Sequence, residues 1–354
     1  MIVKAPARIC LFGDHQDYLE LPVIACAIDK YITVEGKPNC SNFLNFFLLD
    51  LKKEFSVDLN DELNNIKKGD HIRYVIKTLK KNSYNINKGY DIKIYSEIFI
   101  NAGISSSSAL TVALLKFFCE TFSNRKISNV DLAELAYQSE VIEQGGSGGR
   151  MDQYSISLGK TIFLQTGENY SFDRLKSPFN NFIVANSSVK KQTDFLLKNL
   201  KAKTLNSINK LRGFNPLFDI SKVKISELVY YSEILEKSSF TYFEAAVLNH
   251  HITLLAYKEL KKTNPDLLKL GKLMNEHHDI LKNKLSITVP KIDYMIETAR
   301  KHGAYGTKII GSGGGGSILI LSEKLHHKKI INELSKIGVN EIIKANESSG
   351  ILSL

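Results

Sequence analysis

Cysteine, long apolar runs and blocks of like charge are all scarce in this chain of 354 residues. Its 4 cysteines form no CxxC pair and no compact cluster, which argues against a zinc site or a disulfide framework. The longest uninterrupted apolar run, residues 21–28, is far too short to cross a bilayer. No apolar segment follows a basic start at the N-terminus, so we expect no secretory signal. These absences predict a reduced, cytoplasmic protein without a membrane partner.

Basic residues outnumber acidic ones but are dispersed along the chain. The 47 Lys and Arg against 37 Asp and Glu give a net charge of +10. The densest patches, such as Lys77, Lys80 and Lys81, are short, and none approaches the run of like charges found in a nucleic-acid-binding arm. We therefore expect no nucleic-acid partner. The positive surplus favours an anionic small substrate such as a nucleotide.

Length and pattern predict two α+β domains. A chain of 354 residues exceeds the size at which one core usually stops growing, and we place the domains at 1–170 and 171–354. Apolar (43%) and charged (24%) fractions are those of an ordinary globular protein. Mixed strands and helices indicate antiparallel pairing. Residues 151–158 fit a helix or a strand equally well. We predict strands at 9–12, 23–28, 90–99, 182–185, 307–310, 317–321 and 341–344, helices at 110–118, 130–144, 292–299 and 325–337, and mostly helix from 190 to 285.

A serine-rich segment opens the helix that follows the strand at 90–99. Gly103 is followed by Ser105, Ser106, Ser107 and Ser108, and serine is a preferred N-cap, so the helix should begin within this run. Backbone N–H groups and the positive end of the helix dipole favour an anion there. Serine hydroxyls can also bind a phosphate-associated Mg²⁺. An ordinary capped helix start is the alternative.

A second glycine-rich loop lies between two predicted strands. Gly311, Gly313 and Gly316 spell G-x-G-x-x-G, but a strand follows where a dinucleotide fingerprint requires a helix. Nucleotide binding of that type is therefore not predicted. The loop lacks side chains, which would let another group approach its backbone. A purely structural turn is the alternative.

Two carboxylates flank a third glycine-rich stretch. Glu140 precedes it and Asp152 follows Gly149. A carboxylate directly after flexible glycines can act as a base toward a hydroxyl or bind a metal, and a structural role is the alternative. The histidines form no HExxH motif, and the neighbours His277 and His278 diverge on a helix, so no zinc site is predicted.

Four motifs occur in order along the whole chain: Pro6-Ala7-Arg8 through Gly13-Asp14-His15-Gln16-Asp17-Tyr18, Gly103-Ile104-Ser105-Ser106-Ser107, Met151-Asp152-Gln153, and Gly311 to Gly316. Together they resemble those of the GHMP kinases (galacto-, homoserine, mevalonate and phosphomevalonate kinases). The first looks like the Gly-Glu-His-Thr-Asp-Tyr of galactokinases, and Met-Asp-Gln is the sugar-kinase form. The resemblance implies a two-domain GHMP kinase fold with the active site in the interdomain cleft and a ferredoxin-like C-terminal domain.

The same resemblance implies an ATP- and Mg²⁺-dependent sugar kinase that converts an anomeric hydroxyl to a sugar 1-phosphate. Asp152 would be the base and Arg8 the cation beside it, while Ser107 and Glu140 would hold Mg²⁺. The remaining roles fall into three groups: Gly103, Ser105, Ser106, Ser107 and Ser108 would cradle the ATP phosphates; Asp14, His15, Asp17, Gly149 and Asp152 would contact the sugar; and Gly311, Gly313 and Gly314 would pack against the active site.

Departures from the family pattern bear on the sugar more than on the reaction. Asp14 stands where the family usually has glutamate, so its reach is one methylene shorter, and Phe99 stands where the second motif normally has proline. A heptose, an arabinose or a uronic acid stays open as the substrate. A mevalonate-type alcohol is disfavoured, because the run from His15 to Tyr18 suits a polyhydroxy substrate. A non-catalytic sugar and nucleotide sensor is the last alternative. The partners would be a sugar and ATP, and the protein a monomer or homodimer.

Overall fold

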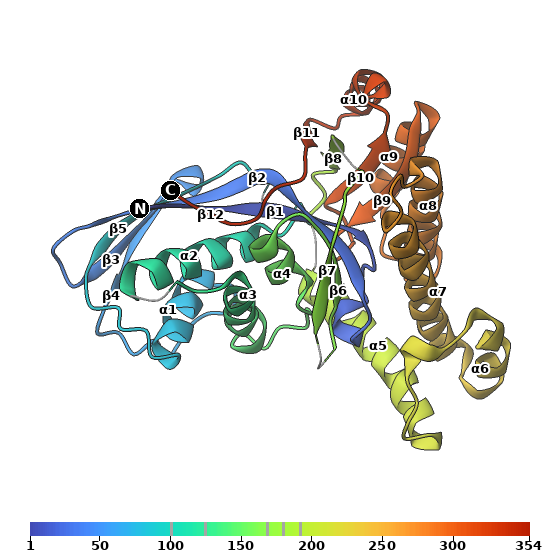
Figure 1. Ribbon diagram of the computed structural model, residues 1–354, viewed down its shortest axis with the longest axis horizontal. Coiled ribbons are helices and arrows are strands. Elements are labelled where there is room, and N and C mark those ends of the chain that lie inside the picture. The colour runs from blue at the N-terminus through green and yellow to red at the C-terminus, as the bar shows by residue number, and fades with distance from the viewer. Residues whose placement is uncertain (100–101, 124–125, 168–169, 179–180, 191–192) are drawn as a thin grey trace.

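The computed structural model describes the chain except residues 100–101, 124–125, 168–169, 179–180 and 191–192. Within this described part, the strands form two sheets that lie in separate layers (Figure 1). The first sheet has the order β12-β1-β2-β5-β3-β4, with β6 added to β2 and β7 to β6; the second has the order β11-β8-β10-β9. The strands are β1 (Ile2–Phe12), β2 (Val23–Pro38), β3 (Phe43–Leu48), β4 (Lys53–Asp58), β5 (Tyr90–Ser96), β6 (Thr161–Gln165), β7 (Ser171–Leu175), β8 (Phe182–Asn186), β9 (Ala304–Ile310), β10 (Ser317–Ser322), β11 (Glu341–Ala345) and β12 (Leu352–Ser353).

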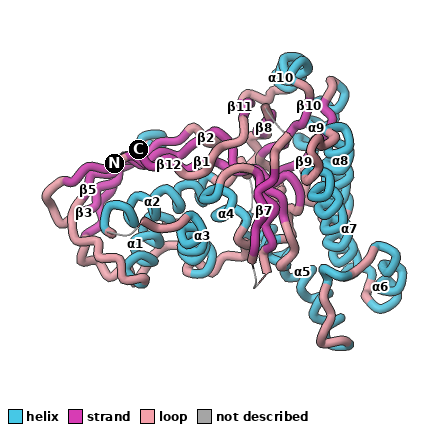
Figure 2. Tube along the Cα trace, viewed as in Figure 1, coloured by secondary structure: helices cyan, strands magenta, loops and turns pink. Residues whose placement is uncertain are grey.

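The helices divide between the two sheets. The first four cover one face of the first sheet, and α8 and α9 pack against the second (Figures 1 and 2). No helix of the described chain is both long and apolar enough to cross a membrane. The helices are α1 (His71–Lys81), α2 (Ser106–Phe122), α3 (Asn129–Tyr137), α4 (Met151–Leu158), α5 (Thr193–Phe214), α6 (Leu228–Ile234), α7 (Lys237–Leu260), α8 (Leu267–Asn283), α9 (Pro290–Lys301) and α10 (His327–Lys336).

The first sheet is built around the long strand β2. It pairs antiparallel with β1 along most of its length, with β5 at its C-terminal end and with β6 at its N-terminal end. The pair of β3 and β5 is parallel. The last strand, β12, pairs with β1 through Val3 and Ser353, so the two ends of the chain lie beside each other (Figure 1).

The second sheet has a ferredoxin-like arrangement. Its strands are all antiparallel and enter the sheet in the chain order 4-1-3-2 when β8, β9, β10 and β11 are numbered from 1 to 4. Helices α5 to α9 connect β8 to β9, and α10 connects β10 to β11, which is the β-α-β-β-α-β pattern. The predicted ferredoxin-like C-terminal domain and the α+β class are confirmed.

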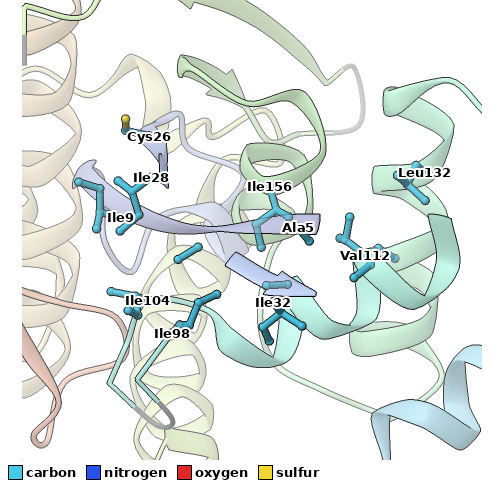
Figure 3. Packing of buried hydrophobic residues seen from close by; sticks show 14 of the residues in the cluster. Ala5, Ile9, Cys26, Ile28, Ile32, Ile98, Ile104, Val112, Leu132 and Ile156 are labelled. Carbon is cyan, nitrogen blue, oxygen red and sulfur yellow. The ribbon is translucent and has the colours of Figure 1, made fainter. Parts of the chain in front are cut away.

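A core between the first sheet and α2 fixes the serine-rich segment. The stretch from Ala109 to Cys119 is buried on nearly all sides, which is typical of a helix inside a core. Ile104, directly before the serines, is fully buried in the same cluster as Ile9 and Ile98 (Figure 3). Burial of a side chain of this size contributes about 1.5–3 kcal/mol. The apolar neighbour thus anchors the polar segment that follows it.

Most predicted elements lie where the pattern placed them, and the exceptions have physical reasons. Residues 151–158 form a helix, α4, whose side chains are nearly all buried, so it has no polar face that would reveal its period. The hairpin of β3 and β4 was not predicted; it is half exposed and alternates poorly. Helix α1 was also missed, although its buried residues recur at helical spacing. The predicted division at residue 170 falls inside the hairpin of β6 and β7, so strand pairing assigns 171–175, like β12, to the first sheet.

Candidate active site

A cavity of about 790 Å³ is walled by both halves of the chain. The first half contributes strand β1, the turn after it, the start of α2 and the glycine-rich stretch before α4, and the second half contributes the start of α5 and the β9–β10 loop. The predicted site residues on its wall are Arg8, Asp14, His15, Asp17, Ser107, Ser108, Glu140, Gly149, Asp152 and Gly311. Gly103, Ser105, Ser106, Gly313 and Gly314 are not among the residues that line it.

Asp152 is held on the cavity wall by several hydrogen bonds. It lies in the first turn of α4, and its carboxylate accepts from Arg8 Nε at 2.6 Å and Nη2 at 2.8 Å. The hydroxyl of Ser105 donates to the same carboxylate, and that of Ser108 lies 3.4 Å away. Its side chain is 26% exposed, whereas that of Arg8 is 6% exposed. A fork of this kind fixes the carboxylate and still leaves it open to the cavity.

Arg8 connects this carboxylate to the serine-rich segment. Its Nη1 donates to the carbonyl of Gly103 at 2.8 Å, and its backbone N–H donates to that of Ile104 at 3.3 Å. Burial alone would lower the pKa of Arg8, but the charge of Asp152 and its hydrogen bonds raise it, and the net shift is upward. Arg8 is therefore a permanent cation at the junction of β1, α2 and α4.

The helix begins within the serine run, as predicted, but no serine side chain caps its first N–H groups. Ser105 takes the N-cap position with a left-handed φ of 60°, and its hydroxyl turns to Asp152 instead of capping the helix. Helix α2 then starts at Ser106, and Ser107 and Ser108 lie on the cavity wall. The first N–H groups of a helix have no partner within it and attract anions. The cavity therefore has a site for negative charge at this helix start.

Glu140 lies in a π-helical turn, Gln138–Ile142, that directly follows α3. Such π-helical turns are rare and are frequent at functional sites. The buried Gln153 donates from Nε2 to Glu140 Oε2 at 2.7 Å, which fixes this carboxylate from the helix that carries Asp152. Nowhere in the described residues do three or more His, Cys, Asp or Glu side chains converge on one point. A cation here would depend on Glu140, Ser107 and ligands brought by a substrate.

Asp17 and Gly149 are in direct contact on the cavity wall. A Cβ atom on Gly149 would lie 2.5 Å from Asp17 Oδ2, so no larger residue fits. Burial and the nearby charge of Asp152 raise the pKa of Asp17 to about 6. In the same turn, His15 Nδ1 lies 3.1 Å from the hydroxyl of Tyr18. Carboxylates and an imidazole thus lie together on this part of the wall.

Asp14 is almost sealed and pairs with a lysine from the second sheet. Lys308 Nζ lies 2.5 Å from Asp14 Oδ2 and 2.9 Å from the carbonyl oxygen of Cys10. Burial would raise the pKa of Asp14, but the charge of Lys308 outweighs it together with smaller effects, and the net shift is downward. Sequence reasoning missed Lys308, although a lysine inside the predicted strand 307–310 was a visible irregularity.

The glycine-rich loop of residues 311–316 packs mainly against neighbouring segments of the protein. Gly311 and Ser312 lie on the cavity wall, whereas Gly314 N–H donates to the carbonyl of Ile287 at 2.7 Å and Gly316 N–H to that of Val189 at 3.3 Å. A Cβ atom on Gly313 would lie 2.6 Å from Ile287. The groups that approach this backbone are thus neighbouring segments of the protein.

Several residues outside the motifs reach the cavity without any signal in the sequence. Among them, Lys68 lies in the turn before α1, His71 is the first residue of α1, and Phe195 and Lys198 come from α5. They belong to no motif and are distant in sequence from the residues that do. Only the packing of α1 and α5 around the cavity brings them there.

Comparison with known families matches both halves of the chain. A sequence model of the GHMP kinases N terminal domain matches residues 70–160, one of the GHMP kinases C terminal domain matches 256–340, and a galactokinase galactose-binding signature matches 1–38. Galactokinase of Glaesserella parasuis is 28% identical over 353 residues, which cover 96% of this chain and 91% of that protein. Galactokinase of Thermococcus kodakarensis is 26% identical over the full length of both.

Solved structures show the same fold. Galactokinase of Lactococcus lactis, crystallised with galactose, superposes with a TM-score of 0.88 at 22% identity and covers all of this chain and 95% of that one. Mevalonate kinase of Methanococcus jannaschii superposes with a TM-score of 0.75 at 25% identity over 98% of both chains. The similarity therefore extends over both sheets and the cavity between them.

Proposed function

The chain belongs to the GHMP kinase superfamily, and we propose that it is a galactokinase-like sugar kinase, with ATP as phosphoryl donor and a sugar 1-phosphate as product. One observation carries the proposal: Asp152, held by Arg8, faces a cavity that it shares with the start of α2 and with Gly311. The galactose-binding signature over residues 1–38 and the galactokinase relatives make galactose the first candidate.

Asp152 is the proposed base for the sugar hydroxyl. It would accept the proton of the anomeric hydroxyl while that oxygen forms a bond to the γ-phosphorus and the bond from this phosphorus to the β,γ-bridging oxygen breaks, with ADP as leaving group. Arg8 would hold the carboxylate in place and offset the charge on the transferred group. The exposed edge of Asp152 beside a buried guanidinium supports both roles.

The start of α2 is the proposed phosphate site. Ser107 and Ser108 on the cavity wall, with Gly103, Ser105 and Ser106 beside them in the chain, would position the phosphates. The loop that contains Gly311, Gly313 and Gly314 would pack against the active site, with Gly311 on the cavity wall. Ser107 and Glu140 fit Mg²⁺, because this ion takes oxygen ligands and usually binds through one or two carboxylates together with substrate phosphates. Bound with the nucleotide, Mg²⁺ neutralises charge on the β- and γ-phosphates. Gln153 would keep the Glu140 carboxylate directed at that position.

The turn after β1 is the proposed sugar site. Asp14, His15 and Asp17 line one side of the cavity, and Gly149 leaves room for the carboxylate of Asp17. Carboxylates and an imidazole are strong hydrogen-bonding groups for sugar hydroxyls, and a site built on such groups rejects substrates that lack them. Together with Asp152 they would orient the anomeric hydroxyl toward the phosphates.

A coupled assay of ADP formation tests the function. The purified enzyme, ATP and Mg²⁺ are combined with a panel of galactose, glucose, mannose, arabinose, a heptose, a uronic acid and mevalonate. We expect turnover with galactose or a close epimer, and a product whose phosphate lies on the anomeric carbon by ³¹P NMR. Turnover of mevalonate alone would overturn the sugar kinase assignment. Sugar and nucleotide binding without ADP formation would instead identify a sensor.

A further inference from the structure

Lys308 breaks the pattern of the strand that carries it. Strand β9 is buried toward its C-terminal end, and Ile309 and Ile310 directly after Lys308 are fully buried. The side chain of Lys308 is also fully buried. Lysine is almost never buried unless it is paired, and an isolated buried charge is costly. A residue that breaks a local rule in this way commonly has a functional reason.

The reason lies in the opposite sheet. Lys308 reaches across the layers to Asp14 Oδ2 at 2.5 Å and to the carbonyl of Cys10 at 2.9 Å, and the side chain of Asp14 is only 3% exposed. Asp14 belongs to the turn after β1, whereas Lys308 stands three residues before Gly311. One ion pair therefore connects the proposed sugar site to the strand that leads into the glycine loop.

Lys308 is the main cation that acts on Asp14. The other titratable groups facing this carboxylate are Cys10 and Arg8 from β1 and His277 from α8, and His15 is its neighbour in the turn. The His277 ring is stacked on Phe12, and neither of its nitrogens has a hydrogen-bond partner among the described residues. Burial and the charge of Lys308 lower the pKa of His277 to about 3, so this ring is neutral at physiological pH.

We propose that Lys308 is a positioning residue for sugar binding, which acts by keeping Asp14 ionised and fixed at the cavity wall. The inference rests on the proposed function, because it takes Asp14 as a sugar contact. With one oxygen held by Lys308, the carboxylate presents a defined acceptor to a sugar hydroxyl. Asp14 is a methylene shorter than the glutamate usual in the resembled family, and Lys308 fixes this shorter side chain. Loss of Lys308 should therefore weaken binding of the sugar rather than binding of the nucleotide.

The first test separates sugar binding from turnover. Lys308→Met removes the charge and retains most of the stem, and we expect the KM for the sugar to rise about 10- to 100-fold, with kcat and the KM for ATP within about threefold of wild type. The matched control is Lys284→Met, which breaks a pair with Glu244 (2.7 Å) away from the cavity wall and should leave all three constants unchanged.

A pH profile distinguishes positioning from a structural role. Lys308 is the largest influence that opposes the effect of burial on Asp14, so its loss should raise the pKa of Asp14. The sugar KM of Lys308→Met should therefore fall as pH rises. This titration should be absent from wild type and from Asp14→Asn/Lys308→Met. Asp17 also titrates in this cavity, but its contribution is common to all three proteins and cancels in the comparison.

A double variant keeps the inference falsifiable if Lys308→Met does not fold. Asp14→Asn/Lys308→Met has no buried charge at this position. If Lys308 acts through Asp14, its sugar KM should match that of Asp14→Asn within about threefold, whereas a further tenfold rise would overturn the inference. A wild-type sugar KM in folded Lys308→Met would also overturn it. Failure of the proposed function looks different, because wild type itself would then turn over no sugar.

Discussion

Two aspartates of the cavity wall are each paired with a buried cation, but the pairs differ in exposure and in what they connect. Asp152 is 26% exposed and pairs with Arg8 through both of its oxygens, within the first half of the chain. Asp14 is 3% exposed and pairs with Lys308 through one oxygen, across the two sheets. The same residue type thus meets two requirements. A reacting carboxylate needs an open edge, and an orienting carboxylate needs a fixed position.

The difference also predicts how each pair fails. Removal of one partner from a sealed pair leaves an uncompensated buried charge, which is strongly destabilising. Around Asp152, water and two serine hydroxyls can compensate in part. Variants at Asp152 should therefore change the rate of reaction more than they change folding, and variants of the sealed pair should do the reverse.

The largest expected effect separates the two aspartates directly. Asp152→Asn keeps the shape and removes the basicity, so turnover should fall about 10²- to 10⁴-fold, with nucleotide binding by calorimetry near wild type. Asp14→Asn should lower kcat less than about tenfold while it raises the KM for the sugar. If Asp152→Asn retained near-native turnover at saturating sugar and ATP, the base would have to be another residue.

Removal of the cation tests whether Arg8 and Asp152 act together. Arg8→Leu should lower turnover about 10- to 100-fold, because it loses both the positioning of Asp152 and a positive charge near the transferred group. The loss in Arg8→Leu/Asp152→Asn should be smaller than the product of the two single losses, since the residues act as one unit. Steady-state kinetics on all three variants measure this, and independent, multiplying losses would show separate roles.

A smaller loss of kcat is expected for variants of the two serines that face Asp152, and the loss should differ between them. The hydroxyl of Ser105 donates to the carboxylate at short range, and that of Ser108 lies 3.4 Å from it. Ser105→Ala should lower kcat about tenfold, which is the value of one hydrogen bond to a charged group. Ser108→Ala is the matched control and should cost less than about threefold. Equal losses would mean that both hydroxyls act elsewhere, for example on the phosphates.

The smallest effect concerns Asp17, whose nearest strong influence is a like charge. Burial and Asp152 raise its pKa to about 6, above the ordinary 3.8. A raised pKa means that its contribution to stability is fully present below about pH 4 and is lost as pH rises through about 6. Asp17→Asn should therefore melt about 1–4 °C above wild type at pH 8, with the gap closing by pH 4. A gap that is the same at both pH values would contradict this assignment.

Sequence reasoning located the elements whose burial follows a period. Alternation predicted β5, and an apolar run after serines predicted α2, because each has a distinct buried pattern. The helical form of α4 was not predicted, because seven of its eight residues are buried and no polar face reveals the helical period. Helix α1 lies outside the predicted elements, although Ile72, Val75, Ile76 and Leu79 follow the helical period.

The site shows a different limit. The motifs named Arg8 and Asp152, and the family resemblance added Glu140. The structure brings all three to one cavity, while their roles stay predictions. Lys308 could not be assigned in this way, because its partner Asp14 is 294 positions away and no sequence period relates the two. The contact of Ser105 with Asp152 likewise depends on a left-handed backbone at one residue. Such pairings are properties of the packed chain.

The pairing of β12 with β1 makes the backbone nearly a closed ring. Ile2 and Leu354 exchange backbone hydrogen bonds of 3.1 and 2.8 Å, so a short peptide would join the two ends without disturbing either strand. The same fold could then form from a chain whose termini lie at another point of this ring. An exposed segment such as Asn215–Leu217, between α5 and α6, could become the new pair of ends. Circular permutation of this kind would preserve every contact of the cavity while it moves the termini to the opposite half of the molecule.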